Sequence, residues 1–366
     1  MRTYSTTGLT IEYPDNIAFC FNRMLVNIYG EGLESMNIVR AQVSIAGEGN
    51  VAYTDEREPF NNKIYFSIEG YVQALFDNAQ DTTLDYGIST LQKSPYGHMV
   101  TVTLTLFDAQ SSVFEYSFDI YTIWGVMHVG EKFRNSRQLT WFRQFPFTVG
   151  IYSATVGGKV MVKEGDAEPY GLNLEAQALW NIALDSMTDS DTIEFFVSKH
   201  YSTFDLTFDN SFIYAADEDT TIVCKADDCT KGVYLRWVNR VGIYCYYLFQ
   251  HGDETREVQD EGSFILNSRQ DAGFIRGHNG GYGRQQQKTE IDTLPICVPL
   301  VDSDTYDFLF GVITSPVVDM YMGKDEEGLP QWCAVNITAD KFVKTKESLQ
   351  DFTCTLELPQ ISMQSL

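Results

Sequence analysis

The sequence predicts a mainly β fold, built from antiparallel β-sandwich domains with a few short helices. Aromatic residues make up 14% of the 366 residues, including 21 Tyr and 24 Phe. Thr, Val and Ile recur in short blocks, a composition that suits pleated, half-buried surfaces. In addition, the aromatic-rich runs of residues 232–249 flank the turn-forming loop Asn239–Gly242, a pattern typical of a β-hairpin. The length suggests two domains.

We expect residues 1–150 to form an N-terminal β-sandwich domain. Between positions 101 and 106, threonine alternates with Val or Leu, so one face of this strand should be buried and the other exposed to water. Residues 69–78 instead place apolar side chains at helical spacing, which predicts a short helix that caps the pair of sheets. The strands expected in this domain are Ile17–Tyr29, Asn37–Ala46, Ile64–Ile68, Met99–Phe107 and Val113–Trp124.

We expect residues 151–366 to form a second, β-rich domain. An amphipathic pattern predicts a helix over 173–186. Asp304 is placed to cap another helix, over 304–313, ahead of Pro316. Five glycines in the segment 268–288 resist packing and predict a long loop or arm. The remaining expected strands are Ile193–Val197, Phe204–Phe208, Val317–Met322, Gln331–Ile337 and Phe352–Leu358.

The charge balance argues against several classes of protein. Lys and Arg total 26 against 50 Asp and Glu, which leaves a net charge of −24. Binding to a nucleic-acid backbone depends on cations that displace counterions, so specific nucleic-acid binding is not expected. The longest apolar stretch, Ile243–Phe249, is much shorter than the ~20 residues that span a bilayer. Met1–Tyr13 also lacks the apolar core of an export signal, so we expect no membrane insertion.

No motif in the sequence indicates a cofactor or a catalytic centre. Gly47, Gly49 and Ala52 match the spacing of a dinucleotide fingerprint after an apparent strand. The residues that follow show no helical stripe to hold a pyrophosphate, which favours a β-turn. Walker, HExxH and GxSxG motifs are absent from the sequence. We therefore expect no cofactor and no catalytic residues.

The cysteines and aspartates do not match the spacing of a metal site. The seven cysteines are an odd number in a chain without an export signal, which favours reduced thiols. Cys224 and Cys229 could hold half of a zinc site or form a local disulfide, but a closed zinc site needs four ligands. The Asp-rich stretches at 189–191, 217–219 and 302–307 lack the glycine and glutamate of an EF-hand. Turns and helix caps explain them, and no metal is expected.

A carbohydrate-binding or glycan-cleaving β-sandwich is an alternative function. The 50 acidic residues can supply carboxylate pairs for glycoside hydrolysis, although the sequence does not give their separation. Trp237, Tyr244 and Tyr246 of the predicted hairpin could stack on sugar rings if their faces are exposed. Because side chains alternate along a strand, about half of these aromatic residues should point into the core.

Two basic segments stand out against the acidic background. Lys132, Arg134, Arg137 and Arg143 lie close together among aromatic residues. In so acidic a chain, we expect them to complement an acidic patch on a neighbouring copy. The second segment is the glycine-rich arm at 268–288, which we expect to order on contact at a subunit interface. Its interface candidates are Arg269, Arg276, Tyr282 and Arg284.

A series of ordered blocks carries a family resemblance. The blocks are FCFNRMLVNIYG, FSIEGYVQALFD, LTWFRQFPFTVGIY, CTKGVYLRWVNRVGIYCYYLF, TYDFLFGVITSPVVDMY, WCAVNI and FTCTLELP. Together they cover most of the chain and resemble structural proteins of tailed-bacteriophage tails and baseplates, with the nearest likeness to distal-tail-type proteins. Each block is a β-sheet pattern, so the resemblance transfers no catalytic residue.

The resemblance implies a non-enzymatic structural protein of the virion, assembled in the host cytoplasm. Such a protein forms a homo-oligomeric ring, commonly a hexamer, that joins the tail tube to the baseplate or receptor-binding parts. Its partners are other tail and baseplate proteins. The negative net charge fits a tail lumen that passes DNA, because like charge prevents DNA from sticking. Large sheet surfaces, exposed edges and arms suit a ring subunit.

Overall fold

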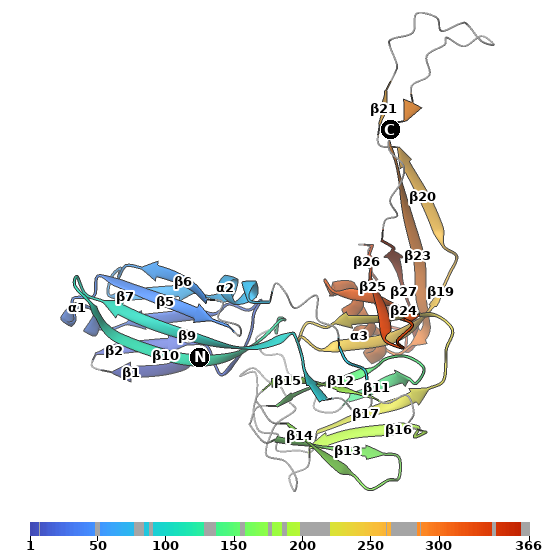
Figure 1. Ribbon diagram of the computed structural model, residues 1–366, viewed down its shortest axis with the longest axis horizontal. Helices are drawn as coiled ribbons and strands as arrows, with labels where there is room; N and C mark the ends of the chain where they lie inside the picture. The colour runs from blue at the N-terminus through green and yellow to red at the C-terminus, as the bar shows by residue number, and fades with distance from the viewer. Residues whose placement is uncertain are drawn as a thin grey trace, which may run out of the picture. The chain divides into compact units, whose positions relative to one another are not determined.

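The described part of the chain is mainly β, with three short helices (Figure 1). The computed structural model describes residues 1–6, 8–47, 52–76, 84–87, 91–127, 137–153, 158–174, 178–184, 189–197, 220–260, 262–264, 284–285, 287–338 and 342–359. The strands and short helices of these residues confirm the predicted fold class, mainly β with antiparallel sheets and a few short helices. In these ranges no helix has both the length and the apolar character needed to cross a membrane.

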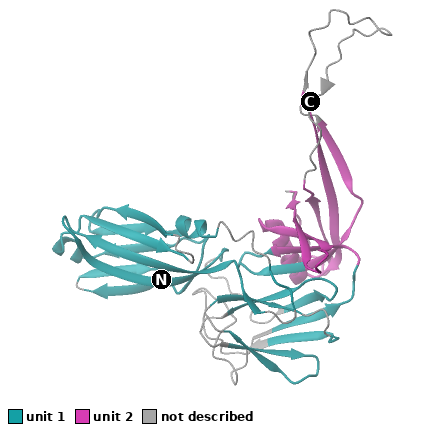
Figure 2. Cartoon of the chain, in the orientation of Figure 1, with its two compact units in different colours: residues 1–230, 238–246 teal, residues 231–237, 247–366 magenta. Residues whose placement is uncertain are grey.

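The chain divides into two compact units (Figure 2). Unit 1 comprises Met1–Thr230 and Val238–Tyr246, and unit 2 comprises Lys231–Trp237 and Tyr247–Leu366. The boundary expected near residue 150 therefore lies inside unit 1. The predicted hairpin is present as β18 (Val233–Val238) and β19 (Tyr244–His251), neighbours in one sheet. Each of its strands contributes residues to both units.

Unit 1 begins with a β-sandwich of two sheets (Figure 1). The first sheet, in spatial order, consists of β1 (Arg2–Thr6), β2 (Leu9–Tyr13), β4 (Leu25–Tyr29) and β7 (Lys63–Ser67). The second consists of β3 (Ile17–Phe19), β10 (Ser112–Ile123), β9 (Gly97–Phe107), β5 (Arg40–Ala46) and β6 (Ala52–Arg57). Neighbouring strands are antiparallel except β3 and β10, which run parallel. The predicted strand Ile17–Tyr29 is thus two strands in different sheets.

Strand β9 has the alternation that the sequence predicts. On the inner face of the sandwich, the side chains of Val102, Leu104 and Leu106 are fully buried. The threonines between them are partly exposed, and the Thr103 hydroxyl lies 2.9 Å from the Ser117 hydroxyl across the strand pair. Burial of one face and pairing of hydroxyls on the other explain why Thr, Val and Leu suit this strand.

Two helices lie in the sandwich, α1 (Gly32–Ser35) and α2 (Glu69–Ala74). Helix α2 is the one predicted over 69–78, of which residues 77 and 78 lie outside the described ranges. Val72 of α2 is fully buried, and Phe76 just after it is 3% exposed. The Gln73 side chain donates from Nε2 to the Cys20 carbonyl at 2.8 Å. These contacts fix the helix against one end of the sandwich.

The rest of unit 1 forms two further sheets. One consists of β11 (Arg137–Phe142), β17 (Thr220–Asp227), β16 (Thr192–Val197), β13 (Gly158–Glu164) and β14 (Tyr170–Leu174), in that order. The other consists of β12 (Thr148–Ser153), β15 (Ala178–Ala183) and β8 (Leu91–Lys93). The helix predicted over 173–186 was wrong, because its described residues, apart from Leu184, lie in β14 and β15. Strand β15 is buried on both faces, so its nearly continuous apolar run mimics an amphipathic helix.

Unit 2 contains one large sheet and a small two-stranded one. The path of the large sheet is β25 (Pro330–Ala334), β24 (Val318–Lys324), β18, β19, β23 (Lys288–Val301), β27 (Gln350–Glu357) and β26 (Asn336–Ile337). Off this path, β20 (Thr255–Asp260) pairs with β23. The small sheet joins β21 (Ser263–Phe264) to β22 (Arg284–Gln285). The expected strand Phe204–Phe208 and most of the predicted arm at 268–288 lie outside the described residues.

Helix α3 (Ser303–Thr314) covers the helix predicted over 304–313, but its cap is a different residue. The Asp302 side chain, not that of Asp304, accepts the Thr305 backbone N–H at 2.7 Å. Asp304 lies within the first turn, where a carboxylate also interacts favourably with the helix dipole. The helix packs on the sheet of unit 2 through Phe308, whose ring centroid lies 5.3 Å from that of Trp237.

Candidate assembly surface

Most of the interface candidates fall where the structure gives no side-chain detail. Outside the described residues lie Lys132, Arg134, Arg269, Arg276 and Tyr282. The backbone places Arg137 and Arg284 at the first positions of β11 and β22. For all of these residues, a role at a subunit contact stays a prediction.

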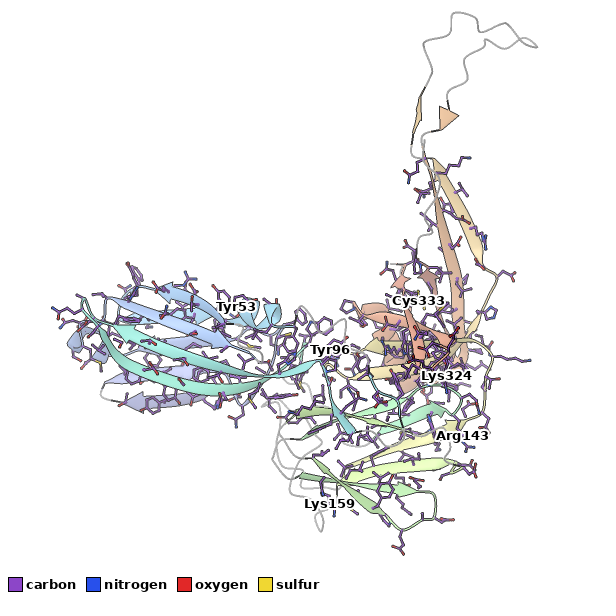
Figure 3. All side chains as sticks on the ribbon, viewed as in Figure 1. Tyr53, Tyr96, Arg143, Lys159, Lys324 and Cys333 are labelled. Carbon is purple, nitrogen blue, oxygen red and sulfur yellow. The ribbon has the colours of Figure 1, made fainter. Side chains whose placement is uncertain are left out.

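Arg143 has a described side chain, and it stabilises the fold of unit 1 (Figure 3). Its Nη2 donates to Asp191 Oδ1 at 2.6 Å and to the Ser190 carbonyl at 3.0 Å. Its Nη1 lies 3.5 Å from Asp228 Oδ1, and only 16% of the side chain is exposed. The guanidinium therefore holds together turns that are far apart in sequence. Its two Nη groups are engaged within the unit and its Nε is buried, so Arg143 is poorly placed to meet an acidic patch on another copy.

The proposed sugar-stacking residues are buried. Trp237 is 1% exposed, and in unit 2 the Gly311 backbone lies against its indole. Tyr244 and Tyr246 are 5% and 2% exposed. In unit 1 the Tyr246 hydroxyl lies 2.9 Å from that of Thr148. Since a stacking platform needs an open ring face, these aromatic residues act as core residues in this structure.

The segments that carry the cofactor and metal motifs lie in strands or just beyond them. Ala46 pairs with Ala52 in the antiparallel ladder of β5 and β6, so a strand, not a helix, follows the glycine-rich segment. Cys224 is buried in β17, whereas Cys229 is exposed beyond its end. Among the described residues, no group of three or more His, Cys, Asp or Glu is arranged to hold a metal ion.

Unit 2 contains a two-stranded ribbon, of which the β20 strand is exposed. We define the β20–β23 ribbon as Thr255–Asp260 with Lys288–Thr293. The two segments are antiparallel, with Thr255 opposite Thr293 and Asp260 opposite Lys288. Figure 1 shows the ribbon standing off the rest of unit 2, with β21 beyond its end. Most of the predicted glycine-rich arm, residues 268–288, lies in the sequence between the two strands of the ribbon.

One face of the ribbon gathers acidic groups around a single arginine. The Arg256 guanidinium lies 3.3 Å from Glu254, 3.6 Å from Glu290 and 3.9 Å from Asp292, and its side chain is 63% exposed. Val258, next on this face, is 55% exposed. Exposed ion pairs contribute about 1 kcal/mol at most, so they stabilise the ribbon only weakly. Little of its stability comes from buried apolar surface.

A β-bulge in β23 presents a second exposed feature of unit 2. The register with β27 shifts between Val298 and Val301. Leu300 in this bulge has a φ of 53°, a conformation that bulky residues rarely adopt. Its backbone N–H donates to Asp351 Oδ1 at 2.9 Å, and its side chain is 69% exposed. Bulges commonly re-aim a side chain, and this one turns an apolar group toward solvent.

Sequence reasoning missed the ribbon and the bulge. Residues 255–260 contain one apolar residue, Val258, so neither apolar alternation nor β-propensity marks them as a strand. The partner segment, Lys288–Thr293, did carry a strand signal, because Ile291 and Thr293 alternate with charged residues. Comparisons with protein-family models and with curated proteins found no match for this chain. The exposed elements described above are therefore the basis for a functional assignment.

Proposed function

We propose that the chain is a non-enzymatic structural component of a phage tail or baseplate. Its copies form a ring that joins the tail tube to baseplate or receptor-binding parts. The observation that carries the proposal is the β20–β23 ribbon, an exposed element that leaves the body of unit 2 (Figure 2). A ring subunit needs such elements to meet its neighbours. The ordered sequence blocks provide the link to phage tails.

An exposed aromatic turn on unit 1 adds support. Phe60 and Lys63 exchange backbone hydrogen bonds of 2.9 and 3.1 Å around Asn61 and Asn62. Both asparagines have positive φ values, of 50° and 56°, as the tight two-residue turns of hairpins require. The turn begins at Phe60, which is 77% exposed, and leads into edge strand β7, where Tyr65 is 69% exposed. Exposed aromatic residues at a sheet edge suit a surface that contacts other proteins.

The charge of the chain is compatible with a place in a DNA-passing tail. At a net charge of −24, each copy repels a polyanion. The carbohydrate-binding alternative finds no such support, because Trp237, Tyr244 and Tyr246 are buried. A structural role is therefore the function that the described surfaces favour.

The ring can be tested on the purified chain and on particles. Light scattering after size-exclusion chromatography should give a whole multiple of the monomer mass, and electron micrographs of the same fraction should show closed rings. Gold-labelled antibodies against the chain should mark the tail end of phage particles, whereas antibodies against a capsid protein should mark the head. A chain that stays monomeric across a wide concentration range and labels no particle would contradict the proposal.

A further inference from the structure

The outer edge of β20 is an unpaired strand edge. Among the described strands, β20 pairs only with β23. Alternate backbone N–H and C=O groups along Thr255–Asp260 therefore point away from the ribbon, without a ladder partner in the described residues. A two-stranded ribbon is marginally stable in water, and three or more strands are needed for independent stability. A further strand at this edge would stabilise the ribbon.

The residues of this edge restrict which strand can pair with it. Strand β20 has the sequence TREVQD, and alternation places residues 256, 258 and 260 on one face. That face carries a basic, an apolar and an acidic residue in turn. Directly opposite residues of paired strands attract when their charges are opposite and repel when they are alike. Charge on an edge usually prevents pairing, but this arrangement leaves one favourable register.

That register is an antiparallel pairing of β20 with a second β20, centred on Val258. It places Val258 opposite its own copy and Arg256 opposite Asp260, twice by symmetry. On the other face, Glu257 lies opposite Gln259. Moving the centre by one residue to Glu257 sets this glutamate opposite its own copy, and moving it to Gln259 sets Arg256 opposite Gly262 and so removes its acidic partner. The edge is therefore complementary to itself, as a twofold contact requires.

We propose that two copies of this chain pair along β20, antiparallel about a twofold axis at Val258, so that two ribbons form one four-stranded sheet. The backbone ladder and the Val258 contact stabilise the pair. The register that sets Arg256 opposite Asp260 favours opposite charges over like charges, and such ion pairs add little affinity. The contact goes beyond the proposed ring, because rings close through head-to-tail contacts. The pairing is therefore independent of whether rings form.

Disulfide trapping tests both the contact and its register. We would introduce Val258→Cys, Glu257→Cys and Gln259→Cys separately, each with Cys229→Ser to remove the exposed native thiol. All three positions are exposed residues of β20, so the variants should fold alike. Under mild oxidation, Val258→Cys should form a covalent dimer at least about tenfold faster than either neighbour, because paired thiols meet at a high effective concentration. Sedimentation equilibrium of the unmodified chain gives an independent measure of pairing.

The neighbouring positions act as matched controls. Alone, Glu257→Cys and Gln259→Cys should cross-link slowly, because each lies opposite the other residue and not opposite itself. A mixture of these two variants should give a mixed dimer at the rapid rate. Equal rates at all three positions would indicate random collision and overturn the proposal. The proposal would also be overturned if Val258→Cys cross-linked slowly and the unmodified chain formed no dimer in sedimentation. This outcome does not depend on whether rings are seen in micrographs.

Discussion

Cys20, at the turn after β3, has a side chain that is completely buried. Loss of hydration raises the pKa of its thiol from 9.0 to about 12, although the Gly125 backbone N–H lowers the pKa in part. Below pH 9 the thiol is protonated in both the folded and the unfolded chain. Between about pH 9 and 12 the unfolded chain loses this proton while the folded chain keeps it. The free energy of unfolding therefore falls as the pH rises through this window.

Replacing Cys20 by Ala should flatten this alkaline loss of stability. The loss of the sulfur lowers stability at pH 7, because a small cavity remains, but the pH-dependent part, up to about 4 kcal/mol, disappears. Urea unfolding between pH 8 and 11 measures the slope. The exposed Cys229→Ala is the matched control and should keep the original slope. Buried Cys354, whose pKa is also raised to about 12, maintains part of the slope in both variants. An unchanged slope in Cys20→Ala would show that this thiol ionises normally in the folded chain.

At the scale of elements, the N-terminus of α3 is capped by a single side-chain hydrogen bond that stabilises the helix. Asp302 accepts the Thr305 backbone N–H, and this bond lowers the pKa of the Asp302 carboxyl from its ordinary 3.8. Asp302→Ala should lower the free energy of unfolding by about 1 kcal/mol. Asp304→Ala, which removes a first-turn carboxylate that is not the cap, should cost only a few tenths.

Urea unfolding of both variants at pH 7 and at low pH checks this assignment. Because the pKa of Asp302 is lower in the folded chain than in the unfolded chain, its contribution is present at pH 7 and disappears as the pH falls below about 4. The difference between Asp302→Ala and the unmodified chain should therefore shrink in acid. If Asp304→Ala were the more damaging change, the cap would be the residue that the sequence pattern suggested.

Elements with a clear pattern could be predicted from the sequence. Strand β9 has strict alternation, and α3 has an acidic start and Pro316 after its end. The helix expected over 173–186 failed because β15 is buried on both faces, so its nearly continuous apolar run does not show the period of a strand. In the structure Asn181 is 1% exposed, and its amide has no hydrogen-bond partner in the described residues. A polar residue buried in this way cannot be told from a solvent-facing one by periodicity.

The candidate site was less predictable than the fold, because it depends on contacts between distant residues. The sequence marks Arg143 as basic, but its pairing with Asp191 arises only when β11 and the turn before β16 come together. The aromatic hairpin could be predicted, yet the burial of Trp237 depends on Phe308 of α3, far along the chain. Strand β20 of the ribbon has no apolar pattern. Surfaces that function through exposure lack the hydrophobic signal on which sequence reasoning depends.

At the scale of the whole molecule, net charge should control self-association. Each copy carries a charge of −24, so two copies repel at long range. Salt shortens the range of this repulsion, from about 10 Å at 0.1 M to about 3 Å at 1 M. Backbone ladder bonds and apolar contacts depend little on salt, and exposed ion pairs add little affinity. The dissociation constant for self-association should therefore fall several-fold as NaCl rises from about 0.05 M to about 0.5 M.

Sedimentation equilibrium at several NaCl concentrations measures this dependence, and sodium sulfate at matched ionic strength separates screening from specific ion effects. Equal dissociation constants in the two salts, both falling with ionic strength, would identify screening of like charge as the cause. A dissociation constant that rises with salt would mean instead that opposite charges hold the copies together. In that case basic residues such as Lys132 and Arg134, and not the edge of β20, would be the first candidates for the contact.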